Sequence, residues 1–303
     1  MQNSELHCNG ILPPVTTPFD AKGQVDFEGL RHNVARYNET GLAGYVALGS
    51  NGEAVHLTIE EQTRVIETIK QAALSRHAII AGVNELATQA AIAATRRAAD
   101  AGADVALVIT PYFYKSRMTE AALTQHFIAV ADASPIPLFI YNVPQNTGVV
   151  IDPATIADLA EHTNIAGVKD SAGNFGALAE TIRRAPAGFK LMVGNGGVLY
   201  PSLLMGATGA ILAVACAAPR ACVELYNAVL AGDHGLARDL QNRLAPLSQI
   251  VTAGLGVAAL KAAMGLNGFV GGHPRAPLVP LDESEGARLR AVMRDTGLFP
   301  EME

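Results

Sequence analysis

The sequence predicts an α/β protein, a (β/α)8 TIM barrel followed by a C-terminal extension of three helices. Short apolar runs alternate with amphipathic helical stretches from one end of the chain to the other. There are eight such units, and at roughly 30 residues each they match a barrel of about 250 residues. A doubly wound open sheet is the alternative, but no GxGxxG motif follows the first predicted strand.

Each predicted strand is a short apolar run. Runs of this type are typical of strands that are buried on both faces in a parallel sheet. The eight predicted strands are Ile11–Val15, Gly44–Leu48, Ala78–Gly82, Val105–Ile109, Leu138–Asn142, Ile165–Lys169, Leu191–Gly194 and Ala210–Val214.

The helices between these strands carry their own signals. Thr58 followed by Glu61 is a capping box, and Asp152 followed by Pro153 predicts an N-cap with proline at the first helical position. Apolar residues spaced i, i+4, i+7 give two other helices a core-facing stripe. These stripes are Leu30, Val34 and Tyr37, and Leu123, Phe127 and Val130.

The barrel is predicted to span residues 1–230, with its eighth helix near Pro219–Leu230. The C-terminal extension is predicted to span residues 231–303. No linker-like tract separates the two parts, so the extension should pack on the barrel and not form a separate domain. Its three predicted helices are one with the stripe Leu236, Leu240, Leu244 and Leu247, one over Val257–Met264 and one over Glu283–Asp295.

The composition is that of a compact enzyme. Of 303 residues, 50% are hydrophobic and 17% charged. The net charge is −6 and basic residues form no cluster longer than a pair, so neither nucleic acid nor an anionic membrane is an expected partner.

Other features bear on location. The start, Met1–Gly10, lacks the basic and apolar parts of a secretory signal. Leu203–Ala218 is nearly all apolar, but it falls short of the ~20 residues that a bilayer requires. A helix end, a turn and a buried strand explain it better. Cys8, Cys216 and Cys222 are read as cytosolic thiols with no metal site, and a cytoplasmic enzyme is expected.

One of the six lysines, Lys169, lies where a nucleophile would be placed. It ends an apolar strand, where partial desolvation favours the neutral amine that attacks ketones. A lysine at a strand end can also simply reach water. The other five are less suitable: Lys22 in a polar turn, Lys70 in a polar part of a helix, Lys115 in an aromatic loop, Lys190 at a strand start and Lys261 inside a helix.

Further candidates lie at the C-terminal ends of the strands, where such barrels carry their active sites. Small residues in Gly49–Glu53 let backbone N–H groups and a hydroxyl converge on a carboxylate or phosphate. Tyr141 ends the strand next in sequence to that of Lys169 and could transfer protons there, although a buried tyrosine is often a core residue. Gly194–Gly197 follows the seventh strand, where barrels often hold phosphate, so a phosphate-binding isomerase is a rival prediction.

Five motifs together resemble a known superfamily. They are Thr17-Pro18-Phe19, GSNGE at 49–53, TPYF at 110–113, YNVP at 141–144 and GVKDSAG at 167–173. In this order they are similar to the dihydrodipicolinate synthase and N-acetylneuraminate lyase superfamily of pyruvate-dependent aldolases, over essentially the whole chain.

The resemblance implies roles for individual residues. Lys169 would form the Schiff base, Tyr141 would transfer protons, and Ser50 would orient Tyr141. The implied substrate-binding residues are Gly49, Asn51, Tyr112, Ser171, Gly194 and Ile211. The resemblance also implies a homotetramer, a dimer of dimers, that uses no metal or organic cofactor. Asn51 and Ser171 are equally common as turn formers.

Two departures bear on the branch. Where dihydrodipicolinate synthase has an arginine for a second substrate carboxylate, this chain has Asn146, and Phe113 replaces a tyrosine of a proton relay. Tyr112, Tyr114 or a water could substitute in the relay, and Arg117 or Arg275 could supply the missing cation.

The chain is most similar to the 4-hydroxy-2-oxoglutarate aldolase branch, through strings such as Ser134–Pro137, Asn146–Gly148 and Arg275–Leu278. The sequence therefore predicts reversible cleavage of 4-hydroxy-2-oxoglutarate, or a close 4-hydroxy-2-oxoacid, to pyruvate and an aldehyde such as glyoxylate. The alternatives are dihydrodipicolinate synthase, a sugar-acid aldolase or dehydratase, the phosphate-binding isomerase and a non-catalytic binding protein.

Overall fold

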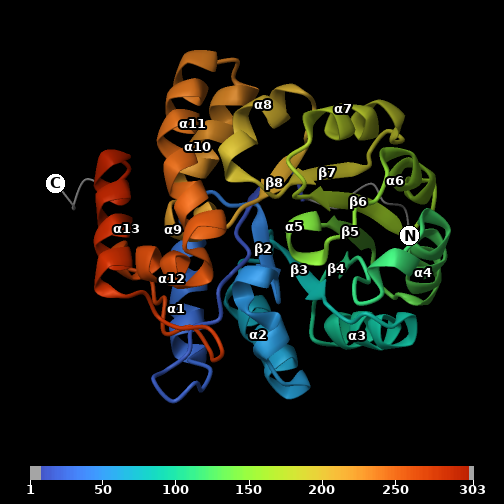
Figure 1. Cartoon of the computed structure of the whole chain (residues 1–303), viewed down its shortest axis with the longest axis horizontal. Helices are drawn as coiled ribbons and strands as arrows, with labels where there is room; N and C mark the ends of the chain where they lie inside the picture. Colours follow the sequence, from blue (N-terminus) through green and yellow to red (C-terminus); the bar gives the residue numbers. More distant parts are fainter. Residues whose placement is uncertain (1–7, 300–303) are drawn as a thin grey trace.

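A computed structural model describes residues 8–299 and has eight parallel strands arranged in a ring. The strands pair in the order β1-β8-β7-β6-β5-β4-β3-β2. The two ends of this order, β1 and β2, are joined by backbone hydrogen bonds that close the ring. Two of these bonds run from Ala43 N to Ile11 O at 3.0 Å and from Val46 N to Pro13 O at 3.0 Å. The strands lie at the centre and the helices surround them (Figure 1). The predicted (β/α)8 barrel is confirmed.

The elements follow one another along the chain with little irregular structure between them. The strands are β1 (Gly10–Leu12), β2 (Gly44–Ala47), β3 (Ala78–Val83), β4 (Val105–Ile109), β5 (Leu138–Asn142), β6 (Ile165–Asp170), β7 (Lys190–Val193) and β8 (Gly209–Ile211). The α-helices are α1 (Phe27–Tyr37), α2 (Ile59–Ala72), α3 (Thr88–Asp100), α4 (Glu120–Ala133), α5 (Pro144–Thr147), α6 (Pro153–Ala160), α7 (Phe175–Arg184), α8 (Leu199–Leu204), α9 (Val214–Ala217), α10 (Pro219–Leu230), α11 (His234–Gln249), α12 (Gly256–Leu266) and α13 (Glu283–Asp295).

Strands β4 and β5 have the predicted bounds, whereas the neighbouring strands β1 and β8 are shorter than predicted. β1 ends at Leu12 because Pro13 and Pro14 have no N–H for the ladder. β8, its neighbour, pairs only as far as Ile211. The prediction that β8 continues to Val214 was wrong, since Val214 begins α9.

The helix predictions hold with one exception. The capping box of Thr58 and Glu61 is present, and Asp152 is the N-cap of α6 with Pro153 as its first residue, although the Asp152 side chain makes no capping hydrogen bond. In α11 the residue Leu236 is 38% exposed, because the buried face of that helix begins at Ala237. The predicted stripes of α1 and α4 are fully buried.

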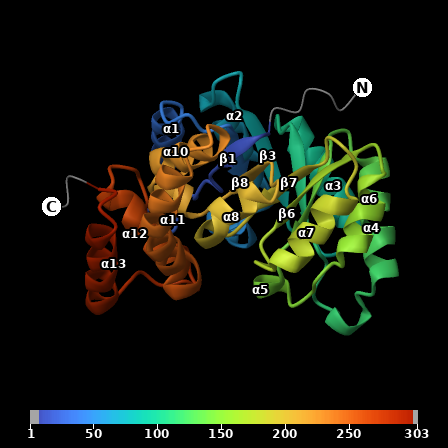
Figure 2. The ribbon, with the colours of Figure 1, turned by 90° about the horizontal axis from the view of Figure 1, so that it is seen from above.

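The core has two parts. Inward-facing side chains fill the barrel, and a larger cluster lies between the sheet and the helices. Leu244 of α11, Met264 of α12 and Met293 of α13 belong to the same outer cluster as Leu30 of the barrel. These helices lie together on one side of the barrel (Figures 1 and 2). The division at residue 230 stays a prediction, because one hydrophobic core runs across it.

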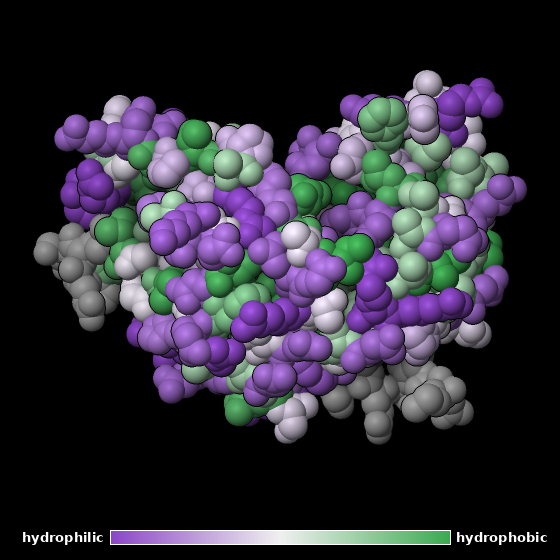
Figure 3. All heavy atoms as spheres, turned by 90° about the horizontal axis from the view of Figure 1, so that it is seen from below, coloured by the Kyte–Doolittle hydropathy of each residue, from purple (hydrophilic) through white to green (hydrophobic). Residues whose placement is uncertain are grey.

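The apolar stretch 203–218 forms the end of α8, a turn, β8 and α9, close to the prediction. Within residues 8–299, none of the helices has both the length and the apolar character needed to cross a bilayer. The surface is hollowed between two raised sides when the molecule is seen from below (Figure 3).

Candidate active site

Tyr141 and Lys169 meet on the inner face of the barrel. Successive residues of a strand point to opposite faces, and Phe139 and Tyr141 belong to the barrel interior whereas Ile140 packs toward the helices. Tyr141 and Lys169 are register partners in β5 and β6. The sequence prediction that the two side chains lie together is confirmed by this pairing.

The Lys169 side chain does not simply extend into water. The residue is 4% exposed, and its Nζ lies 4.3 Å from the centre of the Tyr141 ring. Lys261 is also buried, which its place in an amphipathic helix did not indicate, but its Nζ pairs with the Glu53 carboxylate and donates to His273 O at 2.7 Å. Lys169 therefore combines burial with a position at the carboxyl ends of the strands.

The surroundings of Tyr141 favour its ionised form. Burial raises the pKa of the Tyr141 hydroxyl, but the charge of Lys169 and hydrogen bonds with Ser50, Lys169 and Ser171 together bring that pKa below its ordinary value. Its oxygen lies 3.4 Å from Ser50 Oγ. A phenol in this environment can give up its proton more readily than a free tyrosine.

The loop after β2 forms a short 3-10 helix, Ser50–Gly52, with Gly49 as its N-cap. Ser50 is exposed on the protein surface and Asn51 is half-buried. The next residue, Glu53, has a left-handed backbone with φ of 54° and turns the chain into a second 3-10 helix, Ala54–His56. Ser50 contacts Tyr141, as its predicted role in orienting that tyrosine requires, and the binding of a carboxylate by this loop stays a prediction.

Gly194, which follows β7, packs directly on Lys169 of β6 and on Ser171, which follows that strand. A Cβ at Gly194 would lie 1.9 Å from Ser171 Oγ and 3.2 Å from Lys169 Cε. Ile211 is buried in the barrel interior with Tyr141. The structure thus brings Gly194, Ser171 and Ile211 to the same end of the barrel interior as Lys169.

Ser50 also lines a cavity of about 320 Å³, and neither Tyr141 nor Lys169 is among the lining residues. Tyr112 and Asn146 are among its lining residues, while Phe113 is 74% exposed and Tyr114 is also exposed. The full lining is Ser50, Glu53, Ala54, Val55, His56, Asn84, Ile109, Tyr112, Asn146 and Leu278.

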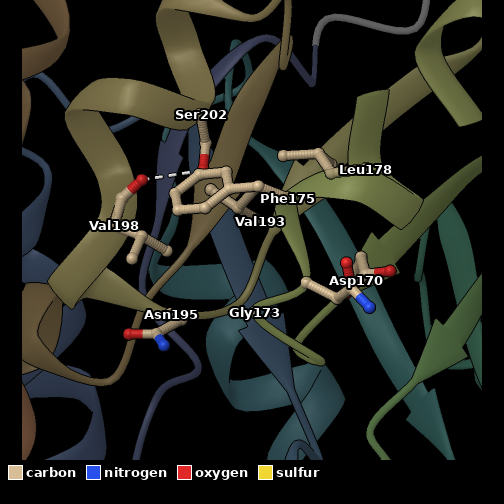
Figure 4. A pocket seen from close by; sticks show the side chains of 9 residues that line it. Asp170, Gly173, Phe175, Leu178, Val193, Asn195, Val198 and Ser202 are labelled. Atoms are coloured by element: carbon tan, nitrogen blue, oxygen red, sulfur yellow. Dashed lines mark hydrogen bonds between the residues drawn. The ribbon is translucent and has the colours of Figure 1, made fainter. Parts of the chain in front are cut away.

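A second, smaller cavity lies beside the ends of β6 and β7, and its volume is about 10 Å³. The Phe175 ring lies close to Val198 and Ser202 in this space (Figure 4). Asp170 lines it too, and burial raises the pKa of that carboxyl although bonds from Ala172 N and Asn142 lower it. About 10 Å³ is room for a single water molecule, and of the predicted phosphate loop Gly194–Gly197 only Asn195 lines this space.

An ion-pair network beneath the Ser50 loop was missed from the sequence. Glu53 accepts from Arg275 N at 2.9 Å and pairs with Lys261. Arg275 forms a two-bond pair with Glu61, with both distances 2.7 Å, so it is held there and does not reach into the cavity. Its partners are 222 and 214 positions away in the sequence, and no local pattern signals such pairs.

Comparisons with known proteins agree with this geometry. The model of the dihydrodipicolinate synthetase family matches residues 7–296. The chain belongs to this family. Relatives named 4-hydroxy-tetrahydrodipicolinate synthase include one from Methanothrix thermoacetophila, 39% identical over 94% of this chain and 95% of the relative, and one from Neisseria meningitidis, 39% identical over 95% and 98%.

A solved structure of the same family is also similar. YagE, a prophage protein of E. coli K12 described in complex with pyruvate, superposes with a TM-score of 0.90 at 31% identity and covers 96% of this chain and 99% of its own. The predicted superfamily is therefore confirmed, and so is an enzyme of the pyruvate-dependent aldolase and synthase type. The relatives' names do not support the closer assignment to 4-hydroxy-2-oxoglutarate aldolase; they support the alternative, dihydrodipicolinate synthase.

Proposed function

We propose that this chain is a Schiff-base lyase in which Lys169 binds the pyruvate unit. The supporting observation is the pairing of Lys169 with Tyr141 at the enclosed end of the barrel, with Ser50 Oγ 3.4 Å from the tyrosine oxygen. Nucleophile, proton carrier and a third group that orients the carrier are then in contact, as covalent catalysis requires. The family membership supports the same chemistry.

In the cleavage direction, the neutral amine of Lys169 attacks the C2 ketone of a 4-hydroxy-2-oxoacid, and loss of water gives an iminium ion. Tyr141 accepts the proton of the C4 hydroxyl as the C3–C4 bond breaks, and the iminium receives the two electrons to become an enamine. The aldehyde leaves. Tyr141 returns a proton to C3, and water hydrolyses the new iminium to pyruvate and free Lys169.

In the synthetic direction the enamine of pyruvate attacks an aldehyde carbon, and Tyr141 protonates the new alkoxide. The relatives' names favour aspartate semialdehyde as that aldehyde, which makes 4-hydroxy-tetrahydrodipicolinate synthase the first candidate. In both directions, Gly49, Asn51, Ser171, Gly194, Ile211 and Tyr112 are the residues proposed to surround the bound acid.

Cleavage of 4-hydroxy-2-oxoglutarate is the second candidate, and it is kept because the chain departs from the synthase branch at Asn146 and Phe113. Asn146 lies in the cavity wall at the position where the synthase branch resemblance implies an arginine. A guanidinium would give a charge-assisted pair of bonds to a second carboxylate, which an amide does not. Phe113 has no hydroxyl and is exposed, so it cannot replace the relay tyrosine.

The test is a direct comparison of two reactions. Pyruvate release from 4-hydroxy-2-oxoglutarate and condensation of pyruvate with aspartate semialdehyde are measured with the same preparation. The larger kcat/KM assigns the branch. Borohydride added with pyruvate should give one reduced pyruvyl group, located at Lys169 by peptide mapping. Modification at Lys261 or Lys115 instead would overturn the mechanism.

We also propose that the enzyme is cytoplasmic and assembles as a homotetramer. The exposed rings of Phe113 and Tyr114, which contact each other with centres 5.1 Å apart, offer apolar surface suited to a partner subunit. Light scattering measures the assembly, and a monomer would contradict this proposal.

A further inference from the structure

The loop after β6 places Ser171 against the reacting groups. Ser171 directly follows the strand, and a Cβ at Gly194 would meet both Ser171 Oγ and Lys169 Cε. A hydrogen bond with Ser171 is also among the contacts that lower the pKa of the Tyr141 hydroxyl. Because a serine side chain is short, the position of its Oγ depends closely on the backbone of its loop.

The backbone of this loop is held by hydrogen bonds on both sides of Ser171. Ser171 N donates to Asn142 O at 2.9 Å, and Gln145 Nε2 donates to Ser171 O. The next N–H, that of Ala172, donates to Asp170 Oδ1 at 2.7 Å. Gln145 is exposed, whereas Asn142 is buried and Asp170 is half-buried. The firm anchors of the loop are therefore Asn142 and Asp170.

The two anchors are bonded to each other. Asn142 and Asp170 are register partners in β5 and β6, and Asn142 Nδ2 donates to Asp170 Oδ2 at 3.2 Å. Asn142 Oδ1 accepts from Ile151 N at 3.4 Å, which leaves the amide nitrogen facing the carboxylate. Each oxygen of Asp170 accepts one bond, as suits an ionised carboxylate. We refer to these two residues as the Asn142–Asp170 pair.

The Asp170 side chain does not face the reacting groups. Successive strand residues point to opposite faces, so Asp170 lies on the helix side whereas Lys169 lies inside the barrel. There it lines the small cavity with Phe175 and Leu178 of α7 (Figure 4). Within residues 8–299 it makes no ion pair, and its oxygens accept only the two bonds described above. Asp170 can therefore affect the reaction only through the loop that it holds.

We propose that the Asn142–Asp170 pair positions Ser171 beside Tyr141 and Lys169, which makes Asp170 a positioning residue of the Schiff-base reaction. This inference rests on the proposed function, because it assigns a supporting group to that reaction. When the pair is broken, the loop is released, and the Tyr141 hydroxyl loses its bond with Ser171. The same role applies to both candidate reactions, since Tyr141 transfers the proton in each.

Asp170→Asn breaks the pair with almost no change of shape. Its amide nitrogen would face Asn142 Nδ2, so that two donors meet. We expect kcat/KM to fall about 10-fold and the apparent pKa of Tyr141, read from the pH profile of kcat/KM, to rise by about one pH unit, the scale of one hydrogen bond. The sign is diagnostic, because removal of a nearby negative charge by itself would lower the pKa of a tyrosine.

Two double variants and a control complete the design. Adding Asn142→Asp to Asp170→Asn exchanges donor and acceptor at unchanged net charge, and it should restore both kcat/KM and the apparent pKa. Adding Ser171→Ala to Asp170→Asn should cost no more than Ser171→Ala alone, since both changes remove the same contact. Asp158→Asn, at an exposed position of α6, is the matched control and should leave both quantities unchanged.

The outcomes separate the role of Asp170 from the proposed function. Borohydride trapping of pyruvate at Lys169 shows that a variant is folded and that its amine is intact. In trapped variants, an apparent pKa that stays or falls, or losses that add with Ser171→Ala, overturn the positioning role. A trapped exchanged pair that is still 10-fold slow does the same, and this arm does not require a stable Asp170→Asn protein. A wild-type enzyme that forms no adduct with pyruvate overturns the proposed function instead.

Discussion

Gly194→Ala tests how tightly the loop after β7 packs on the Schiff-base lysine. The new methyl group would lie 1.9 Å from Ser171 Oγ, 2.9 Å from Ser171 Cβ and 3.2 Å from Lys169 Cε. Gly194 does not have a positive φ, so alanine adds no backbone strain, and the whole effect arises from this contact. The Ser171 side chain has to turn away.

The expected loss is worked from these contacts. When the Ser171 hydroxyl rotates, Tyr141 loses one of the hydrogen bonds that lower its pKa. The Ser171 Cβ and Lys169 Cε must also shift by several tenths of an ångström. Overpacking of this kind costs about 1–3 kcal/mol, and a displaced catalytic group reduces the rate by about 10- to 100-fold.

The assay is the rate of pyruvate release or consumption, together with borohydride trapping and the melting temperature. Gly265→Ala is the matched control, because a Cβ there meets nothing within 4 Å in α12. A helix alanine should leave the rate unchanged and raise stability by about 0.5–1 kcal/mol. Ser171→Gly combined with Gly194→Ala should recover adduct formation, since the clashing side chain is removed.

A Gly194→Ala enzyme with wild-type kcat and KM would refute this reasoning. It would show that the loop after β7 moves away from Lys169 at no cost, so that the close packing in the structure has no part in placing the amine. An equal loss in Gly265→Ala would show that the effect is not specific to the site.

Three further predictions concern other buried groups. Tyr141→Phe should lower turnover by about 10²- to 10⁴-fold with the fold retained, and near-normal turnover would assign the proton to another group. Burial lowers the pKa of His126 to about 4. The unfolded chain therefore takes up that proton first, near pH 6.5, and stability is lost as the pH falls toward 4, by about 3 kcal/mol. Urea unfolding of wild type and His126→Gln measures it, and equal acid sensitivity in both would contradict it. Lys261→Met should cost about 3–5 kcal/mol because Glu53 is left buried and unpaired, and adding Glu53→Gln should recover most of it; no recovery would mean that packing dominates.

The fold and the central pair of the site could be predicted from the sequence because both depend on local patterns. The period of the apolar residues distinguishes strands from helices, and the alternation along β5 and β6 places Tyr141 and Lys169 on one face. The same patterns could not locate the end of β8. That boundary depends on its neighbour β1, which Pro13 ends.

The tertiary structure alone decided which charged groups are buried. Lys261 had the appearance of an ordinary helix lysine. Its pairing with Glu53 arises only when α12 and the segment around Arg275 pack against the loop after β2 and enclose Glu53. A buried charge is tolerated only beside its partners, and those partners are brought together by contacts between distant segments, which no periodicity in the chain encodes.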